Sequence, residues 1–394
     1  MKTKKSRIVI LICTLALAGI SLVAFTQIGA YAKPRAAPLQ LGQSTGYEQT
    51  NLVSNIAGLA PNTDPKLLNP WGFIENADGT FRVAANGSGR GILFSAQGVR
   101  DGADIIIPTP AGSAHNSSAT PNGVVPNDTS GFVISDHGKS APATLLFSTE
   151  DGTIAGWNPQ VNQAHAVIAA DQSGNDAIFK LLALGTNAQG TFIFATDFHN
   201  GVVDIFDSSF DLVHFGANAF VDPTTGPDAI PSDFAPFGVK NFGGTLFVTY
   251  AMQDADREDD VAGVGNGFID EYDTSGNFIR RFATRGALNS PIGATIAPAD
   301  FGQFSNDVLI GNFGDSRVNA FDPATGAFLG QLTDTNGDPL VLNGGFQETD
   351  TKGLWGIGFG NGVNGAGTNA MFFAAGINEE NDGLFGKVTA AGSN

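Results

Sequence analysis

The chain has 394 residues, of which 42% are hydrophobic and 15% charged, and it includes 52 glycines and 31 phenylalanines. Its 38 acidic side chains outnumber its 20 basic ones, giving a formal net charge of −18. This charge argues against nucleic acid and anionic membrane surfaces as partners, because both are polyanions.

The N-terminal segment has the features of an export signal. Basic residues at the very start precede an uninterrupted apolar run from Ile8 to Ile20, and Ala30 and Ala32 form the small-x-small pattern of a signal-peptidase site. We therefore expect residues 1–32 to be a signal peptide and the rest of the chain to be secreted or periplasmic, with no membrane attachment after cleavage. The alternative is an uncleaved anchor, because the apolar stretch is close to membrane-spanning length.

Cleavage would leave an acidic chain without cysteine. Residues 1–32 hold four of the Lys and Arg residues and no Asp or Glu, so the mature chain would have 16 positive and 38 negative side chains, a net charge of −22. The single cysteine, Cys13, lies in the same segment, so the mature chain would have no disulfide and would depend on its core. Residues 33–46 are expected to form a disordered leader and residues 391–394 a tail.

Internal repetition indicates the fold. After residue 40, short apolar runs alternate with Gly, Asn and Asp clusters, which is typical of an all-β chain. Six units share a strand, a polar loop and a further strand, and their starts lie 47 to 64 residues apart. The units are FRVAANGSGRGILFS (81–95), LLFSTEDGTIAGWN (145–158), FIFATDFHNGVVDIFD (192–207), LFVTYAMQDADRED (246–259), VLIGNFGDSRVNAFD (308–322) and MFFAAGINEENDGLFG (371–386).

A shorter strand precedes most units, and a turn such as DTSGNF (273–278) leads into a fourth. The preceding strands combine Pro or Trp with Gly: NPWGF (69–73), APFGV (235–239), SPIGA (290–294), GLWGI (353–357), a weaker LLALG (181–185) and a still weaker SGFVIS (130–135). Four strands in each of six units predict an all-β, six-bladed β-propeller, in which glycine suits the crowded inner strand. A β-sandwich array is the alternative.

The ends of the repeat predict how the ring closes. The last unit stops at its third strand, GLFGKVTA (383–390), and lacks an outer strand, whereas YEQTNLVSN (47–55) is strand-like and belongs to no unit. We expect residues 47–55 to supply the missing outer strand, so that the propeller spans residues 47–390.

The order of Pro-x-Gly, strand, Asp/Asn loop, strand and Asp-x-x-Gly turn resembles NHL-repeat propellers and the gluconolactonase-like group. Longer strings, including ATDFHNGVVDIFD and GNFGDSRVNAFDPATGAFLG, are similar to an exported bacterial family of conserved hypothetical proteins of unknown function. This resemblance covers nearly all of 47–390 and implies a propeller and an exported location, but no established activity. The gluconolactonase-like group uses an axial metal, and its ligand pattern is not reproduced in this chain.

The repeats place polar side chains on one face of the predicted ring. Loops from second to third strands, and from fourth strands to the next blade, share what we call the loop face. Asn86, Glu150 and Asp197 end the second strands of adjacent blades, and Asn312 lies in the fifth. Such oxygens suit calcium or another divalent cation, so the sequence predicts a metal site there. The alternative is that these side chains form turns with their own backbone.

Asp197 and His199 share one loop, TDFHNG. No two of the five histidines have metal-ligand spacing. His199 is the best candidate for a general base, because it lies beside Asp197 on the loop face. The alternative is a hydrogen-bonded turn residue.

Two acidic stretches are secondary calcium candidates. Asp254 and Asp256 alternate in a loop without the glycine and terminal Glu of an EF-hand, and Asp334, Asn336 and Asp338 have D-x-N-x-D spacing. The alternatives are a solvated loop and a tight turn. The chain has no G-x-S-x-G nucleophile elbow and no phosphate-binding loop.

Two functions are compatible with these observations. The first is a monomeric binding or scaffold protein whose loop face takes a small molecule or a protein. The alternative is a divalent-metal-dependent hydrolase or lyase acting on a small lactone or ester at the axial funnel. The fold alone does not decide between them.

Overall fold

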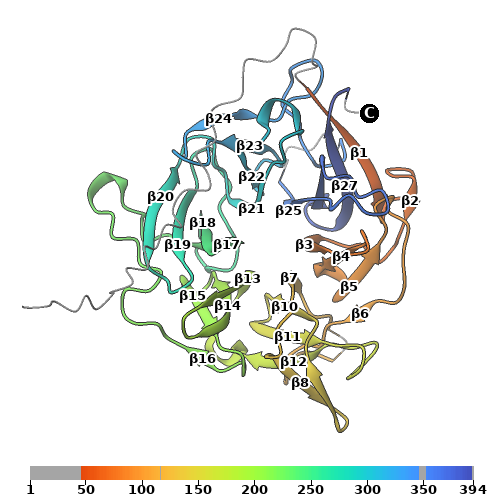
Figure 1. Cartoon of the computed structure of the whole chain (residues 1–394), viewed down its shortest axis with the longest axis vertical. Helices are drawn as coiled ribbons and strands as arrows, with labels where there is room; N and C mark the ends of the chain where they lie inside the picture. Colours follow the sequence, from red (N-terminus) through yellow and green to blue (C-terminus); the bar gives the residue numbers. More distant parts are fainter. Residues whose placement is uncertain (1–45, 116, 346–351, 393–394) are drawn as a thin grey trace, which may run out of the picture. The chain divides into compact units, whose positions relative to one another are not determined.

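A computed structural model describes residues 46–115, 117–345 and 352–392 of the chain (Figure 1). The chain divides into two compact units, Met1–Ala37 and Pro38–Asn394, and the first lies outside the described residues. The expected signal peptide and nearly all of the expected leader lie outside them too. The described residues form 27 β-strands and four short 3-10 helices. In this part of the chain, no helix is long and apolar enough to span a membrane.

Six sheets form the blades of a β-propeller, which confirms the predicted fold (Figure 1). The inner strands begin at the loop face and are β3 (Pro70–Glu75), β7 (Pro121–Pro126), β13 (Phe179–Asn187), β17 (Phe234–Phe242), β21 (Pro291–Ile296) and β25 (Leu354–Phe359). The second strands are β4 (Phe81–Ala85), β10 (Leu145–Thr149), β14 (Gly190–Asp197), β18 (Thr245–Met252), β22 (Val308–Asn312) and β26 (Ala370–Ile377).

The outer half of each blade is more variable in length. The third strands are β5 (Arg90–Phe94), β11 (Thr153–Trp157), β15 (Val202–Phe206), β19 (Phe268–Asp273), β23 (Val318–Phe321) and β27 (Asp382–Ala390). The fourth strands are β6 (Ile105–Ile106), β12 (Val167–Asp171), β16 (Leu212–Val213), β20 (Phe278–Thr284), β24 (Phe328–Gln331) and β1 (Tyr47–Ser54), with β2 (Asn62–Thr63) paired to β1.

The N-terminal strand closes the ring as predicted. Strand β1 pairs antiparallel with β27, from Tyr47 opposite Ala390 to Ser54 opposite Leu384, and the two strands lie side by side in Figure 1. The buried Tyr47 hydroxyl donates to the carbonyl oxygen of Phe301 at 3.0 Å and accepts from the amide of Phe304 at 3.1 Å. Blade 6 is therefore completed by the two ends of the propeller and attached to blade 5.

Inner-strand glycines allow neighbouring blades to approach closely. A Cβ atom added to Gly72 would lie 2.6 Å from the carbonyl oxygen of Asn122, and one added to Gly356 would lie 2.6 Å from that of Trp71. Both contacts join successive blades, so a side chain at either position would push the blades apart. All six inner strands pair with a shifted register beside this position. The close approach explains the recurring Pro/Trp and Gly motif.

Blade 2 departs from the sequence prediction. Its inner strand is β7, whereas the predicted segment 130–135 overlaps β8 (Val133–Asp136), which forms a separate hairpin with β9 (Lys139–Pro142). The apolar pattern of 130–135 has another cause. Phe132 is fully buried and packs edge-on against Phe210 of the next blade, with ring centroids 5.3 Å apart.

The hydrophobic core is divided among the interfaces between blades. Six buried clusters each join side chains of two neighbouring blades. A seventh lies at the start of the inner strands, where Trp71 and Trp355 stack with ring centroids 3.4 Å apart. We call its large rings the axial aromatic cluster: Trp71, Phe198, Phe237, Phe313 and Trp355.

Candidate functional site on the loop face

The four predicted metal-site residues all lie at the loop-face ends of second strands. Asn86 and Glu150 follow β4 and β10, whereas Asp197 and Asn312 are the last residues of β14 and β22. Asn86, Asp197 and Asn312 are buried. The repeat alignment therefore located these positions on the correct face, and their contacts decide which of them come together.

Asn86 and Glu150 are hydrogen-bonded to each other, and Glu150 also contacts a lysine. The Asn86 amide Nδ2 donates to Glu150 Oε2 at 2.8 Å, and the ammonium Nζ of Lys180 lies 2.6 Å from Glu150 Oε1. Lys180 belongs to the inner strand β13, and its side chain is only 2% exposed. The repeat pattern does not point to this residue, although a single lysine within the apolar stretch AIFKLLALG is a signal for it.

Lys180 is held as a cation by neighbouring carboxylates. Burial by itself lowers the pKa of Lys180, but the charge and hydrogen bond of Glu150, aided by Asp259 and Asp260, outweigh burial and raise that pKa. Asp259 Oδ1 lies 3.5 Å from Lys180 Nζ. The ammonium also lies 5.4 Å from the ring centroid of Trp71, within cation–π range.

Glu380 adds a carboxyl group with a perturbed pKa to this cluster. It accepts a 2.8 Å hydrogen bond from Asn69 Nδ2. Burial raises the pKa of Glu380 to about 7 against the effect of the Asn69 bond, and the Glu150 charge adds to the rise. Burial likewise raises the pKa of Asp260 to about 6, against the charge of Lys180. We call Glu150, Lys180, Asp259, Asp260 and Glu380 the axial ion cluster.

The loop that carries Glu380 is strained. Asn378, Glu379 and Glu380 have consecutive φ angles of 57°, 53° and 64°, in the left-handed region that side chains other than glycine rarely adopt. Backbone strain of this kind is concentrated at functional sites, where surrounding contacts hold it in place. In this loop the Asn69 bond to Glu380 is such a contact.

The side chains of Asp197 and Asn312 form hydrogen bonds within nearby loops and not with Asn86 or Glu150. Asp197 Oδ1 accepts the backbone N–H groups of Ile178 and Asn200, and its Oδ2 accepts the Asn200 side chain at 2.8 Å. Asn312 donates to the carbonyl oxygen of Ala287 at 2.9 Å. Within the described ranges, no three His, Cys, Asp or Glu side chains are grouped so that they could hold a metal ion. Divalent-ion binding at the predicted residues stays a prediction.

The secondary calcium candidates also form turns. Asp254 Oδ1 accepts the backbone N–H of Glu258 at 3.0 Å, and Asp256 is exposed. Asp334 Oδ1 accepts hydrogen bonds from the backbone N–H groups of Asn336 and Asp338 at 2.8 and 3.0 Å. These contacts match the alternative of ordinary turns, and calcium binding at either segment stays a prediction.

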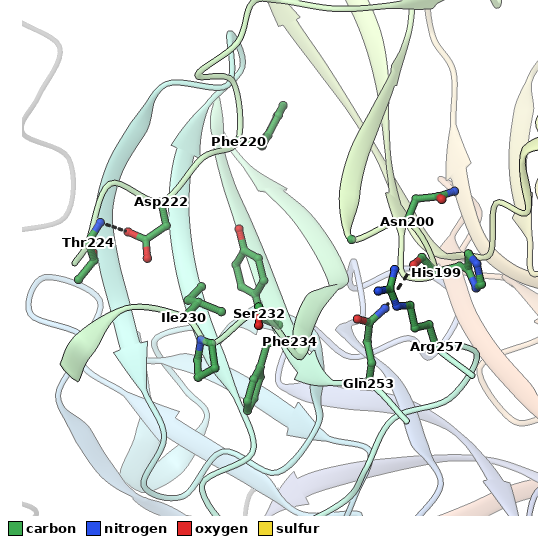
Figure 2. Close-up of a pocket in the computed structure, with 13 residues that line it drawn as sticks. His199, Asn200, Phe220, Asp222, Thr224, Ile230, Ser232, Phe234, Gln253 and Arg257 are labelled. Atoms are coloured by element: carbon green, nitrogen blue, oxygen red, sulfur yellow. Dashed lines mark hydrogen bonds between the residues drawn. The ribbon is translucent and has the colours of Figure 1, made fainter. Parts of the chain in front are cut away.

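A cavity of about 380 Å³ opens on the loop face between blades 3 and 4 (Figure 2). One side is formed by the β14–β15 and β18–β19 loops, and the other by the long connection from β16 to β17. We call it the loop-face cavity. Its lining includes His199, Asn200, Phe220, Asp222, Thr224, Ile230, Ser232, Phe234, Tyr250, Gln253 and Arg257.

His199 is among the residues that line this cavity, and one of its ring nitrogens is unsatisfied. Its Nδ1 is buried and has no hydrogen-bond partner among the described residues. Its carbonyl oxygen accepts a 3.4 Å hydrogen bond from Gln253 Nε2, which fixes the loop (Figure 2). Asp197 does not bond to the imidazole in the described structure, because its carboxylate is used by its own turn. The catalytic role predicted for His199 stays a prediction.

The opposite wall is a buried hydrogen-bonded chain. The hydroxyl groups of Tyr250 and Tyr272 lie 2.9 Å apart, and Tyr272 donates to Asp270 Oδ2 at 3.2 Å. Arg281 then joins Asp270 to Asp222, which lines the cavity. Burial raises the pKa of Asp270 to about 6 against the charge of Arg281. The arginine offsets the charge of Asp222, so this wall carries no free carboxylate.

Two loops, β14–β15 and β18–β19, lie next to both the cavity and the axial ion cluster. In the β14–β15 loop, His199 lines the cavity, whereas the Phe198 ring lies 5.7 Å from the ammonium of Lys180. In the β18–β19 loop, Arg257 lines the cavity and Asp259 contacts Lys180. Gln253 ties the loops together by donating to the carbonyl oxygen of Phe198 at 2.5 Å. A ligand in the cavity would therefore contact loops that also hold the axial charges.

No protein-family model matches the chain. Two proteins of Acanthamoeba polyphaga mimivirus align with most of it. Uncharacterized protein R648 is 31% identical over 349 residues, covering 87% of this chain and 80% of that protein. Uncharacterized protein L690 is 31% identical over 341 residues, covering 86% and 84%. These relatives are viral, so they do not support the bacterial or exported parts of the predicted resemblance. Export stays a prediction.

The likeness to solved structures concerns the fold alone. A streptogramin B lyase structure is 12% identical with a TM-score of 0.48, covering 87% of this chain and 97% of that one. A luciferin-regenerating enzyme is also 12% identical with a TM-score of 0.48, covering 83% and 93%. Identity this low carries no information about a shared site.

Proposed function

We propose that this propeller binds a small polar molecule in the loop-face cavity. The chain belongs to the family of the uncharacterised mimivirus proteins R648 and L690. The observation that carries the proposal is a cavity of about 380 Å³ whose lining brings the polar side chains of Asn200, Gln253 and Arg257 together with the rings of Phe234 and Tyr250. Cavities of about 300–1,000 Å³ with a few convergent polar groups are the usual sites for small ligands.

The lining favours a neutral ligand with several hydroxyl groups. Asp222 is paired with Arg281, and Arg257 lies within a strongly acidic loop, so neither wall presents an excess of one charge. Asn200 and Gln253 offer amide groups, and Phe234 and Tyr250 offer aromatic rings. Rings suit the apolar C–H face of a cyclic molecule, and amides suit its hydroxyl groups. Glucose and its neutral lactone have this chemistry.

A hydrolase or lyase acting on a lactone or ester is the second candidate. The observation that favours it is that His199 is among the residues lining the cavity, because an imidazole is the side chain most often used as a general base. This candidate uses the same cavity and requires turnover in addition to binding.

Titration calorimetry of the purified protein tests binding, with glucose, gluconolactone and the anion gluconate as probes. Ser232→Trp places a large ring at the exposed edge of the cavity. Ser135→Trp makes the same change on the exposed β8–β9 hairpin and is the control. We expect the neutral probes to bind at millimolar concentration and Ser232→Trp alone to abolish binding. Absence of binding by both neutral probes, or binding that survives Ser232→Trp, would contradict the proposal.

A further inference from the structure

A second cavity runs along the propeller axis. It has a volume of about 360 Å³ and is lined by residues from the inner strands of all six blades. We call it the axial channel. Its lining extends from Ile292 and Trp355, near the starts of their strands, to Leu184 and Gly243, near the ends of β13 and β17.

The channel is closed towards the loop face. All six inner strands run away from that face, and the axial aromatic cluster occupies their starts. The stacked rings of Trp71 and Trp355 and the nearby Phe237 ring, 6.0 Å from that of Trp355, fill the axis there. The channel therefore faces the opposite side of the ring and is separate from the loop-face cavity.

The side chains that line the channel are apolar apart from two neighbours, and polar backbone groups of the inner strands are exposed between them. Gly, Val, Leu, Ile, Ala, Pro, Phe and Trp make up the lining except at Lys240 and Asn241. The side-chain amide of Asn241 already has hydrogen-bond partners in the protein. Its Nδ2 donates to the carbonyl oxygen of Leu184 at 2.7 Å, and its Oδ1 accepts the backbone N–H of Gly244 at 2.8 Å. Among the residues that the structure describes, Lys240 is the only ionisable one in the lining.

Lys240 differs from the other inner-strand lysine of the ring. Lys180 contacts the carboxylates of Glu150 and Asp259. Among the ion pairs and hydrogen bonds of the described residues, none involves the ammonium of Lys240. Lys240 is exposed to solvent at this position, and the neighbouring protein atoms lower its pKa by partial desolvation. An ammonium without a protein counter-ion, beside an otherwise apolar set of side chains, is available to pair with a bound anion.

We propose that the axial channel binds a small amphipathic carboxylate, whose apolar chain lies against the inner-strand walls while its carboxylate pairs with Lys240. The apolar lining selects the body of the ligand and the single ammonium selects one negative charge. The acidic balance of the chain, 38 acidic against 20 basic side chains, disfavours ligands with several negative charges. This site does not depend on the function proposed for the loop-face cavity.

Titration calorimetry of the purified protein with octanoate tests the site, and octanol serves as the uncharged probe of the same chain length. Lys240→Met removes the charge and keeps an apolar side chain, and Lys240→Arg keeps the charge. Lys139→Met makes the matched change on the exposed β8–β9 hairpin. Thermal melting of each variant checks that the propeller is folded.

We expect octanoate to bind at least tenfold more weakly to Lys240→Met than to the unmodified protein, since a hydrogen-bonded charge is lost. Octanol binding should change less than threefold, and Lys240→Arg and Lys139→Met should retain octanoate binding. Octanoate affinity should also fall as the pH rises towards the lowered pKa of Lys240, because the amine loses its charge. No octanoate binding at millimolar concentration, or equal binding by Lys240→Met, would overturn the proposal and indicate an ordinary water-filled channel.

Discussion

The ammonium Nζ of Lys180 lies 2.6 Å from Oε1 of Glu150, across the interface between blades 2 and 3. The lysine side chain is 2% exposed and the glutamate side chain 22% exposed, so water screens the pair only from one side. Removing one partner of such a pair costs more free energy than the intact pair contributes to stability, because the remaining charge is left buried without a partner.

We expect Glu150→Gln to lower the free energy of unfolding by about 3 kcal/mol, because the Lys180 charge loses its main partner. Denaturant unfolding measures the change. The double variant Glu150→Gln, Lys180→Met should recover more than half of the loss, since no unpaired charge remains. If the double variant is less stable than Glu150→Gln, the pair does not have the energetic role assigned to it.

The raised pKa of Glu380 predicts a pH-dependent stability difference. Its folded pKa of about 7 exceeds the ordinary glutamate value of 4.5, so the folded state favours the protonated form. Its contribution to stability is present below about pH 4.5 and is lost as the pH rises through 7. Glu380→Gln keeps an acceptor for Asn69 and cannot ionise. Relative to the unmodified protein, this variant should gain about 2 kcal/mol between pH 5 and pH 8. Parallel melting curves would refute the shift.

Lys180 also separates two hypotheses about metal ions. The metal site predicted from Asn86, Glu150, Asp197 and Asn312 implies that calcium at 100 times its dissociation constant adds about 2.7 kcal/mol of stability. Because an ammonium already contacts Glu150, we expect calcium to leave the melting temperature of the unmodified protein unchanged. Lys180→Met frees the carboxylates of the axial ion cluster and should make melting calcium-dependent. Stabilisation of the unmodified protein would support the metal site instead.

Ring closure by β1 predicts unequal effects of two deletions. Removing residues 47–55 should lower the melting temperature sharply, because blade 6 loses its outer strand and the Tyr47 hydroxyl its contacts with blade 5. Removing residues 33–45 should leave it nearly unchanged. Tyr47→Phe, which leaves the buried amide of Phe304 without its side-chain acceptor, should cost about 1–3 kcal/mol. Equal melting of the two deletions would contradict the closure.

The enzymatic alternative predicts a large effect of one substitution. If the protein turns over a lactone or ester, His199→Gln should lower the rate by about 10²–10⁴-fold, the usual effect of losing a general base. Folding should be unaffected, because Nδ1 of His199 has no partner among the described residues. Asp197→Asn should act on stability, since its carboxylate holds the turn. Unchanged turnover in His199→Gln would rule out this role.

The sequence determined the architecture because its evidence is local and repeated. Each unit carries its own strand alternation and turn residues, and the Pro/Trp and Gly motif marks where inner strands approach each other. The unpaired segment 47–55 and the incomplete last unit together indicated the closure that β1 and β27 form. The repeat alignment also placed Asn86 and Glu150 at neighbouring positions on one face, where they do bond.

Only the tertiary structure decided which side chains meet between blades. Lys180 and Lys240 both lie in apolar inner strands, yet one contacts two carboxylates and the other faces the axial channel. That difference depends on the twist and offset of neighbouring sheets, which the pattern within a single strand does not encode. Phe132 shows the same limit, because its apolar segment matched an inner strand but is buried by Phe210 of the next blade. Contacts between segments distant in sequence therefore set the chemistry of a ring whose outline the repeats alone specify.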